Sequence, residues 1–123
     1  KVPNKDPVRT RAMLEKGCTD GFTLGCAGLG LVHEEAKDGA KALVAYERGC
    51  EGGRADACLG AATLHEATDP AKARPLYEKG CAAWSGGACA RLAEMMKAEK
   101  APAKDLKAMK ARACRYGALE ACK

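Results

Sequence analysis

Eight cysteines have the clearest capacity for chemistry in this 123-residue chain, because thiols can form disulfides, bind metals or act as nucleophiles. They fall into four pairs, and seven residues separate the two members of every pair: Cys18/Cys26, Cys50/Cys58, Cys81/Cys89 and Cys114/Cys122. Structural zinc usually takes cysteines two to four residues apart, so this spacing disfavours zinc, although two neighbouring pairs could converge on one ion. Free thiols in a reducing cytosol are the second alternative. Paired cysteines in a small chain favour disulfides and an oxidising compartment.

Other reactive side chains form no catalytic set. His33-Glu34 and His65-Glu66 begin like a metalloprotease helix, but neither continues to the second histidine of that signature. Both histidines stand fifteen residues after the first cysteine of their pair, where the third copy has Met96, which predicts a structural or surface role. Ser85 is the only serine, and no Ser-x-x-Lys motif includes it. We therefore expect no catalytic residue, no metal site and no cofactor.

The cysteines also reveal an internal repeat. The first members of the pairs, at positions 18, 50, 81 and 114, are 32, 31 and 33 residues apart, and periods of this length indicate a solenoid. Good helix formers in amphipathic order precede each first cysteine and follow the second one in the first three copies. Helix starts are marked by Asp6-Pro7, Asp69-Pro70 and Ala101-Pro102.

The cysteine spacing constrains how a bridged pair could be arranged. Residues eight positions apart on a straight helix are about 12 Å apart, whereas a disulfide needs Cα atoms within about 7 Å. If a pair is bridged, the chain must therefore turn between its cysteines. Turn-forming residues lie in each interval: Thr19-Asp20-Gly21, Glu51-Gly52-Gly53, Ser85-Gly86-Gly87 and Tyr116-Gly117. Small residues in the second helices predict close helix packing, and the repeat-equivalent Tyr46 and Tyr77 are predicted to pack inside.

A family resemblance rests on these residues. The pattern Ala-x-x-Leu/Ala-Tyr-Glu-Lys/Arg-Gly-Cys, a glycine-containing turn and Ala-Cys-x-x-Leu/Ala-Ala/Gly is similar to the Sel-1-like repeat, and resembles its cysteine-rich branch typified by the Helicobacter cysteine-rich proteins. The resemblance implies an all-α fold, an α/α solenoid coiled as a right-handed superhelix and related to tetratricopeptide arrays. It also implies one disulfide per helix hairpin, which gives Cys18–Cys26, Cys50–Cys58, Cys81–Cys89 and Cys114–Cys122.

The resemblance covers residues 6–122, and we treat residues 1–123 as one domain. Its repeats are about 6–38, 39–69, 70–101 and 102–123. The last copy is truncated or atypical, since it has Ala113 in place of glycine before its first cysteine and Lys110 in place of tyrosine.

Composition and charge limit the kinds of binding partner and the cellular compartment that we expect for this protein. No apolar run is long enough to span a membrane. No export signal is visible, and the chain begins without methionine, so we expect a mature product of a secreted or periplasmic protein. Residues 1–69 carry 9 basic and 11 acidic side chains, whereas residues 70–123 carry 12 basic and 5 acidic ones. This asymmetry is typical of a solvated surface, or of a docking face for an acidic partner. The few aromatic residues argue against nucleic acid as a binding partner, because single-stranded nucleic acid is commonly bound by stacking its bases on aromatic side chains.

The predicted function is a non-enzymatic scaffold that binds a protein or peptide, acting as a monomer in an exported bacterial protein. Trp84 and Tyr116, in successive turns, are the candidate partner-binding residues, because exposed tryptophan and tyrosine are common binding hot spots. Trp84 could instead cover the end of its hairpin. Two other functions remain as alternatives. One is the β-lactam binding or weak β-lactamase activity that the family resemblance suggests, and the other is a redox or assembly role.

Overall fold

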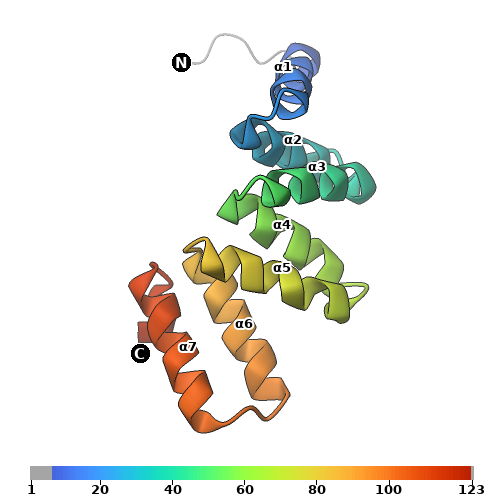
Figure 1. Cartoon of the computed structure of the whole chain (residues 1–123). Coiled ribbons are helices and arrows are strands. Elements are labelled where there is room, and N and C mark those ends of the chain that lie inside the picture. Colours follow the sequence, from blue (N-terminus) through green and yellow to red (C-terminus); the bar gives the residue numbers. More distant parts are fainter. Residues whose placement is uncertain (1–6, 123) are drawn as a thin grey trace.

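The computed structural model describes residues 7–122, and this part of the chain is all-helical, as predicted. Its seven α-helices and one short 3-10 helix run in order without a strand between them (Figure 1). The elements are α1 (Pro7–Thr19), α2 (Thr23–Glu35), α3 (Gly39–Glu51), α4 (Ala55–Glu66), α5 (Pro70–Ala82), α6 (Gly86–Ala98), α7 (Ala103–Arg115) and η1 (Leu119–Cys122).

Consecutive helices pack against each other along the whole array, and contacts between helices further apart in the sequence are few. Figure 1 shows the helix hairpins stacked in chain order as an elongated array, with α1 at one end and α7 at the other. Each repeat therefore buries its apolar surface mainly against its neighbours, which is the organisation of a solenoid.

Four disulfides join the cysteines in the pairing that the family resemblance implied, one within each helix pair. The Cα atoms of the bridged residues are 4.5, 4.5, 4.6 and 4.9 Å apart, in chain order. Such separations are reached only because the chain reverses direction between the two cysteines of each pair. The cysteines of the first three bridges are buried, whereas Cys114 is half-buried and Cys122 is exposed.

A residue with left-handed backbone stands at the same point of each hairpin turn. Three of these are glycines, Gly21, Gly53 and Gly117, with φ between 92° and 105°. In the third hairpin the position is taken by Trp84, with φ 72°. The predicted turn position of Trp84 is therefore confirmed, whereas Gly86 and Gly87, which were predicted to lie in the turn, belong to α6. The reversal comes before Ser85, whose hydroxyl caps α6 by accepting a hydrogen bond from the Ala88 N–H at 3.1 Å.

The predicted helix starts are met in part. Asp69 is the N-cap residue of α5 and Pro70 its first residue, although the Asp69 side chain makes no capping hydrogen bond. Pro102 is the N-cap residue of α7. Asp38, which the sequence analysis did not single out, caps α3 by accepting a hydrogen bond from the Lys41 N–H at 3.1 Å. Asp6 lies outside the described residues.

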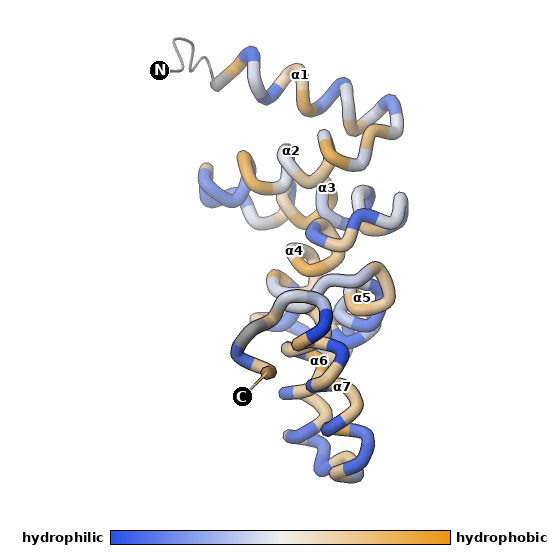
Figure 2. Tube along the Cα trace, turned by 90° about the vertical axis from the view of Figure 1, so that its left-hand side faces the viewer, coloured by the Kyte–Doolittle hydropathy of each residue, from blue (hydrophilic) through white to orange (hydrophobic). Residues whose placement is uncertain are grey.

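The core is thin and built largely from alanine, cysteine and tyrosine, in three clusters that follow one another along the array. The disulfides of the first three repeats are buried, and those of the first and third belong to these clusters. Figure 2 shows hydrophobic positions distributed along every repeat, interspersed with hydrophilic stretches on α1, at the ends of α2 and α3 and on α6 and α7. The bridges therefore add cross-links where apolar side-chain volume is small.

Tyr46 explains two of the glycines in the second helices. Its ring lies between α2 and α4, so a Cβ added to Gly30 would collide with the ring carbons. A Cβ added to Gly60 would lie 2.8 Å from its Cζ atom, well inside van der Waals contact. Tyr46 is 3% exposed and Tyr77 is fully buried, which confirms the predicted packing role of both tyrosines.

Candidate binding site

Tyrosine–glutamate hydrogen bonds join the first repeat to the second and the second to the third. The Tyr46 hydroxyl of α3 donates to the Glu34 carboxylate at the end of α2. In the following junction the Tyr77 hydroxyl donates to Glu66 Oε1 at 2.5 Å, and Arg91 Nη2 donates to the same oxygen at 2.6 Å. The pKa of both tyrosines is raised above its usual range, mainly by burial and secondly by the hydrogen bond to glutamate. The Arg91 hydrogen bond lowers the pKa of Glu66.

These pKa shifts predict the response to alkaline pH. The folded state holds the phenols of Tyr46 and Tyr77 protonated, whereas an unfolded phenol ionises near pH 10.0. The stabilisation is therefore complete below pH 10 and is lost as the pH rises toward the folded-state pKa. We expect urea midpoints to fall above pH 10, and buried-tyrosine phenolate absorbance to appear together with loss of helical circular dichroism. A smaller fall in Y46F than in the parent chain is expected; identical falls would contradict the assignment.

The two histidines occupy equivalent repeat positions but have different surroundings. His65 of α4 is half-buried, and its Nε2 lies 2.9 Å from the carboxylate of Glu47 on α3. His33 of α2 is only 6% exposed, and its ring makes no hydrogen bond to any residue of the described chain. The equivalent glutamate, Glu15 on α1, likewise has no ion pair there. Their equivalent positions predicted one structural or surface role for both histidines, but the surroundings of the two side chains differ.

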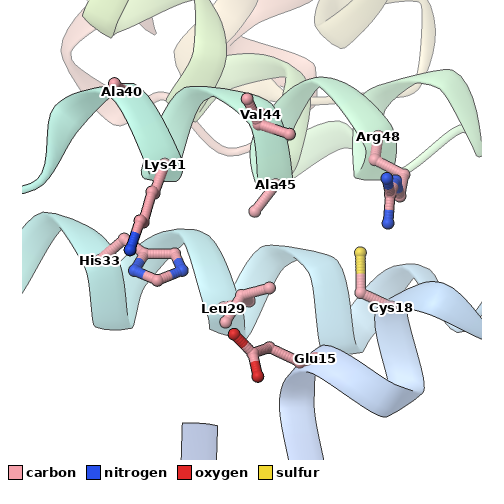
Figure 3. A pocket seen from close by; sticks show the side chains of 9 residues that line it. All are labelled: Glu15, Cys18, Leu29, His33, Ala40, Lys41, Val44, Ala45 and Arg48. Carbon is pink, nitrogen blue, oxygen red and sulfur yellow. The ribbon is translucent and has the colours of Figure 1, made fainter. Parts of the chain in front are cut away.

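His33 lines a pocket of about 380 Å³ where α1, α2 and α3 meet, which we call the α1–α3 pocket (Figure 3). Its walls combine apolar and charged groups from the first two repeats. The lining residues are Glu15, Cys18, Leu29, His33, Ala40, Lys41, Val44, Ala45 and Arg48. Figure 3 shows Lys41 beside the His33 ring at one end, Arg48 near Cys18 at the other, and Glu15 and Leu29 between them. A cavity with a largely apolar lining and a few polar groups is the usual form of a ligand site.

One residue distinguishes this junction from the next one. Ala45 lines the α1–α3 pocket, and the equivalent residue one repeat later, five positions before the first cysteine, is Leu76. Leu76 packs against the buried clusters on both of its sides. At that second junction the histidine is also bonded to its glutamate. The second junction therefore differs from the first in two ways: it has leucine in place of Ala45, and its histidine is paired with glutamate.

Trp84 lies exposed on the third hairpin turn and does not cover the hairpin end. Its side chain is 73% exposed, and its backbone has the left-handed φ at which the other repeats have glycine. Tyr116 in the following turn is half-buried, with the Arg112 guanidinium 5.8 Å from its ring centroid. The two turns are adjacent, since a Cβ on Gly86 would lie 2.7 Å from the Tyr116 carbonyl oxygen. Both candidate partner-binding residues therefore stand at one edge of the array.

The backbone at Trp84 yields a stability prediction. A side chain in left-handed backbone costs about 1–2 kcal/mol relative to the ordinary helical region, and glycine escapes this while adding about 0.5–1 kcal/mol of unfolded-state entropy. W84G is therefore expected to be more stable than W84A, by up to about 1 kcal/mol. Urea unfolding of both variants measures the difference. The alanine variant serves as the control, because it also lacks the exposed ring but keeps the strain. An equally stable or more stable W84A would contradict the strain.

Other predicted features are placed as follows. Of the twelve basic residues in 70–123, five lie on α7, which has one acidic residue, Asp105. Within residues 7–122, no three histidine, cysteine or acidic side chains are grouped to hold a metal ion. No helix in the same range is long and apolar enough to cross a membrane.

The α1–α3 pocket itself was missed by the sequence analysis. The one sequence signal that bears on it is the exchange of Ala45 for Leu76 at equivalent positions, and its effect depends on packing between repeats. Comparisons of the chain with protein-family models and with curated proteins gave no match.

Proposed function

We propose that the chain is a non-enzymatic scaffold that binds an extended protein or peptide segment across the helices of neighbouring repeats. The observation that carries the proposal is the α1–α3 pocket, whose apolar lining and charged ends come from two repeats. Repeat arrays commonly bind extended partners on a surface shared by successive repeats. The repeat pattern supports membership of the cysteine-rich Sel-1-like branch.

We propose an exported protein as the setting. Four disulfides and no free cysteine within the described residues are typical of chains that fold in an oxidising compartment. The cysteines form the disulfides that hold the scaffold together, so we assign partner binding to other side chains. The monomeric state belongs to the same proposal, and sedimentation equilibrium of the oxidised chain tests it.

The non-enzymatic part of the proposal is supported by the surroundings of Ser85. Its Oγ accepts a hydrogen bond from the Ala88 N–H, as a helix cap does, and no histidine or lysine is bonded to it in the described chain. A chromogenic cephalosporin is therefore expected to be hydrolysed at the rate of buffer alone by both the parent chain and S85A. Turnover by the parent above S85A would support the serine enzyme instead.

The scaffold function can be tested with two matched residues. Val44 lines the pocket and is 59% exposed, whereas Leu31 on α2 is 57% exposed and does not line it. Peptides selected from a random phage-displayed library on the oxidised chain are expected to lose binding to V44R and to keep binding to L31R. Failure to select any peptide, or equal binding to both variants, would count against a peptide-binding surface in this place.

A further inference from the structure

The charged groups of the α1–α3 pocket are largely without partners inside the protein. His33 is buried and makes no hydrogen bond through its ring, and Arg48 makes no ion pair with any described residue. Lys41 has only a loose contact, 3.9 Å from Asp38 Oδ2 at the exposed end of α3. Glu15, Lys41 and Arg48 are exposed around the pocket, and His33 lies in its wall. A ligand that supplies opposite charge and hydrogen bonds here would therefore meet groups that have few partners within the described residues.

We propose that this pocket anchors a short extended peptide in which one apolar side chain stands between two acidic ones. The inference rests on the proposed scaffold function and names the ligand chemistry of its pocket. The apolar side chain enters over Leu29, Val44 and Ala45. The two carboxylates reach Lys41 at one end and Arg48 at the other (Figure 3).

The spacing of the two cations matches such a segment. Lys41 and Arg48 are seven residues apart on α3, so their backbones are about 10.5 Å apart at 1.5 Å per residue. In an extended peptide the two neighbours of one residue are about 6.7 Å apart and point away from the face on which that residue points. An inserted apolar side chain thus leaves both flanking carboxylates on the outer side of the peptide. They can meet Lys41 and Arg48 there only because both of these long side chains are exposed and can bend toward the carboxylates at the rim of the pocket.

Glu15 and His33 complete the site. Glu15 lies on α1, opposite α3, and its carboxylate can accept a backbone N–H from the peptide. The imidazole of His33 can donate to a peptide carbonyl or accept from an N–H. Lys41 and Arg48 face a single acidic side chain, Glu15, so the lining has an excess of positive charge. That excess favours an acidic segment over a basic one.

The second junction offers a matched comparison within the same chain. Lys72 and Lys79 on α5 stand where Lys41 and Arg48 stand on α3, nine and two residues before the first cysteine. Between them is Leu76, which packs against the core clusters. The two junctions therefore carry a similar pair of cations, but only the first combines them with a small residue and an unbonded histidine.

The test uses three capped peptides in an identical glycine–serine frame, with the centres Glu-Leu-Glu, Glu-Ser-Glu and Lys-Leu-Lys. Fluorescence polarisation with the oxidised chain is expected to show at least about tenfold tighter binding of Glu-Leu-Glu than of either other peptide. The double variant K41E/R48E is expected to weaken that binding by about tenfold or more. The matched variant K72E/K79E is expected to change it by less than about threefold.

Filling the pocket provides a test that leaves its charges unchanged. A45L copies the residue of the next repeat and is expected to weaken Glu-Leu-Glu binding at least about tenfold, with the helical circular dichroism retained. Equal weakening by the two charge variants, or unchanged binding to A45L, would overturn the assignment of this pocket. Absence of Glu-Leu-Glu binding to the parent chain would overturn it as well. The scaffold function would survive either result if phage-selected peptides still discriminate V44R from L31R.

Discussion

Reduction of all four disulfides is expected to unfold the chain. Closing a loop of about nine residues is worth about 2.6 kcal/mol in the chain-entropy model, so four bridges supply about 10 kcal/mol, against a total of about 5–15 kcal/mol for a typical domain. The alanine-rich core offers little apolar volume to replace them. Far-ultraviolet circular dichroism before and after treatment with a strong reductant measures the effect. Retention of the helical signal and of the thermal midpoint would show that packing alone holds the array.

The four bridges are not expected to contribute equally. Cys50–Cys58 is buried between two full helices, so the double variant C50A/C58A is expected to lower the free energy of unfolding by about 2–5 kcal/mol. Cys114–Cys122 holds only the four-residue η1 and has an exposed member. C114A/C122A is therefore the control and is expected to have the smaller effect. Mild reductant should also open this bridge first, which mass mapping of alkylated thiols detects; simultaneous opening of all four would contradict the order.

Truncation of Tyr77 is expected to be the most damaging single substitution. Tyr77 is fully buried and belongs to the cluster that joins the second and third repeats. Removal of a buried aromatic ring typically lowers the free energy of unfolding by about 3–5 kcal/mol, and here Glu66 also loses the hydrogen bond that the Tyr77 hydroxyl donates. Urea unfolding of Y77A measures the total effect.

Y77F separates the ring from its hydroxyl. It keeps the packing and removes only the hydrogen bond to Glu66, so a loss of about 1–3 kcal/mol is expected. Y116A is the control for tyrosine removal as such, because Tyr116 is half-buried near the end of the array. Equal losses in Y77A and Y116A would contradict the role of Tyr77 as a junction residue.

Much of the fold follows from short-range patterns in the sequence. Helix formers and turn residues recur with the cysteines, so the helix hairpins could be predicted locally. The turn of the third repeat was predicted too long, because Ser85-Gly86-Gly87 has turn composition, whereas Ser85 caps α6 and the two glycines belong to that helix. A bulky residue with positive φ is uncommon, and composition alone does not indicate it. Trp84 was nevertheless assigned to this turn from the sequence, as a candidate partner-binding residue.

The candidate site could not be predicted in the same way. Repeat equivalence gave His33 and His65 one role, but their surroundings differ, since His65 contacts Glu47 and His33 lines an open pocket. The residue that separates the two cases is on another helix, Ala45 in one junction and Leu76 in the next. Equivalent positions keep equivalent backbone, whereas a cavity depends on the summed volumes of side chains that several helices bring together.

The sequence by itself determined the repeat length, the helix hairpins and the interval between two paired cysteines within which the chain had to reverse direction. These properties depend on residues close together in the chain, where spacing and backbone geometry are decisive. Only the tertiary structure decided that Tyr46 lies between Gly30 and Gly60, that Trp84 is exposed, and that a pocket opens between the first two repeats. These features arise where side chains from different helices meet, and their size and charge become decisive only in contact.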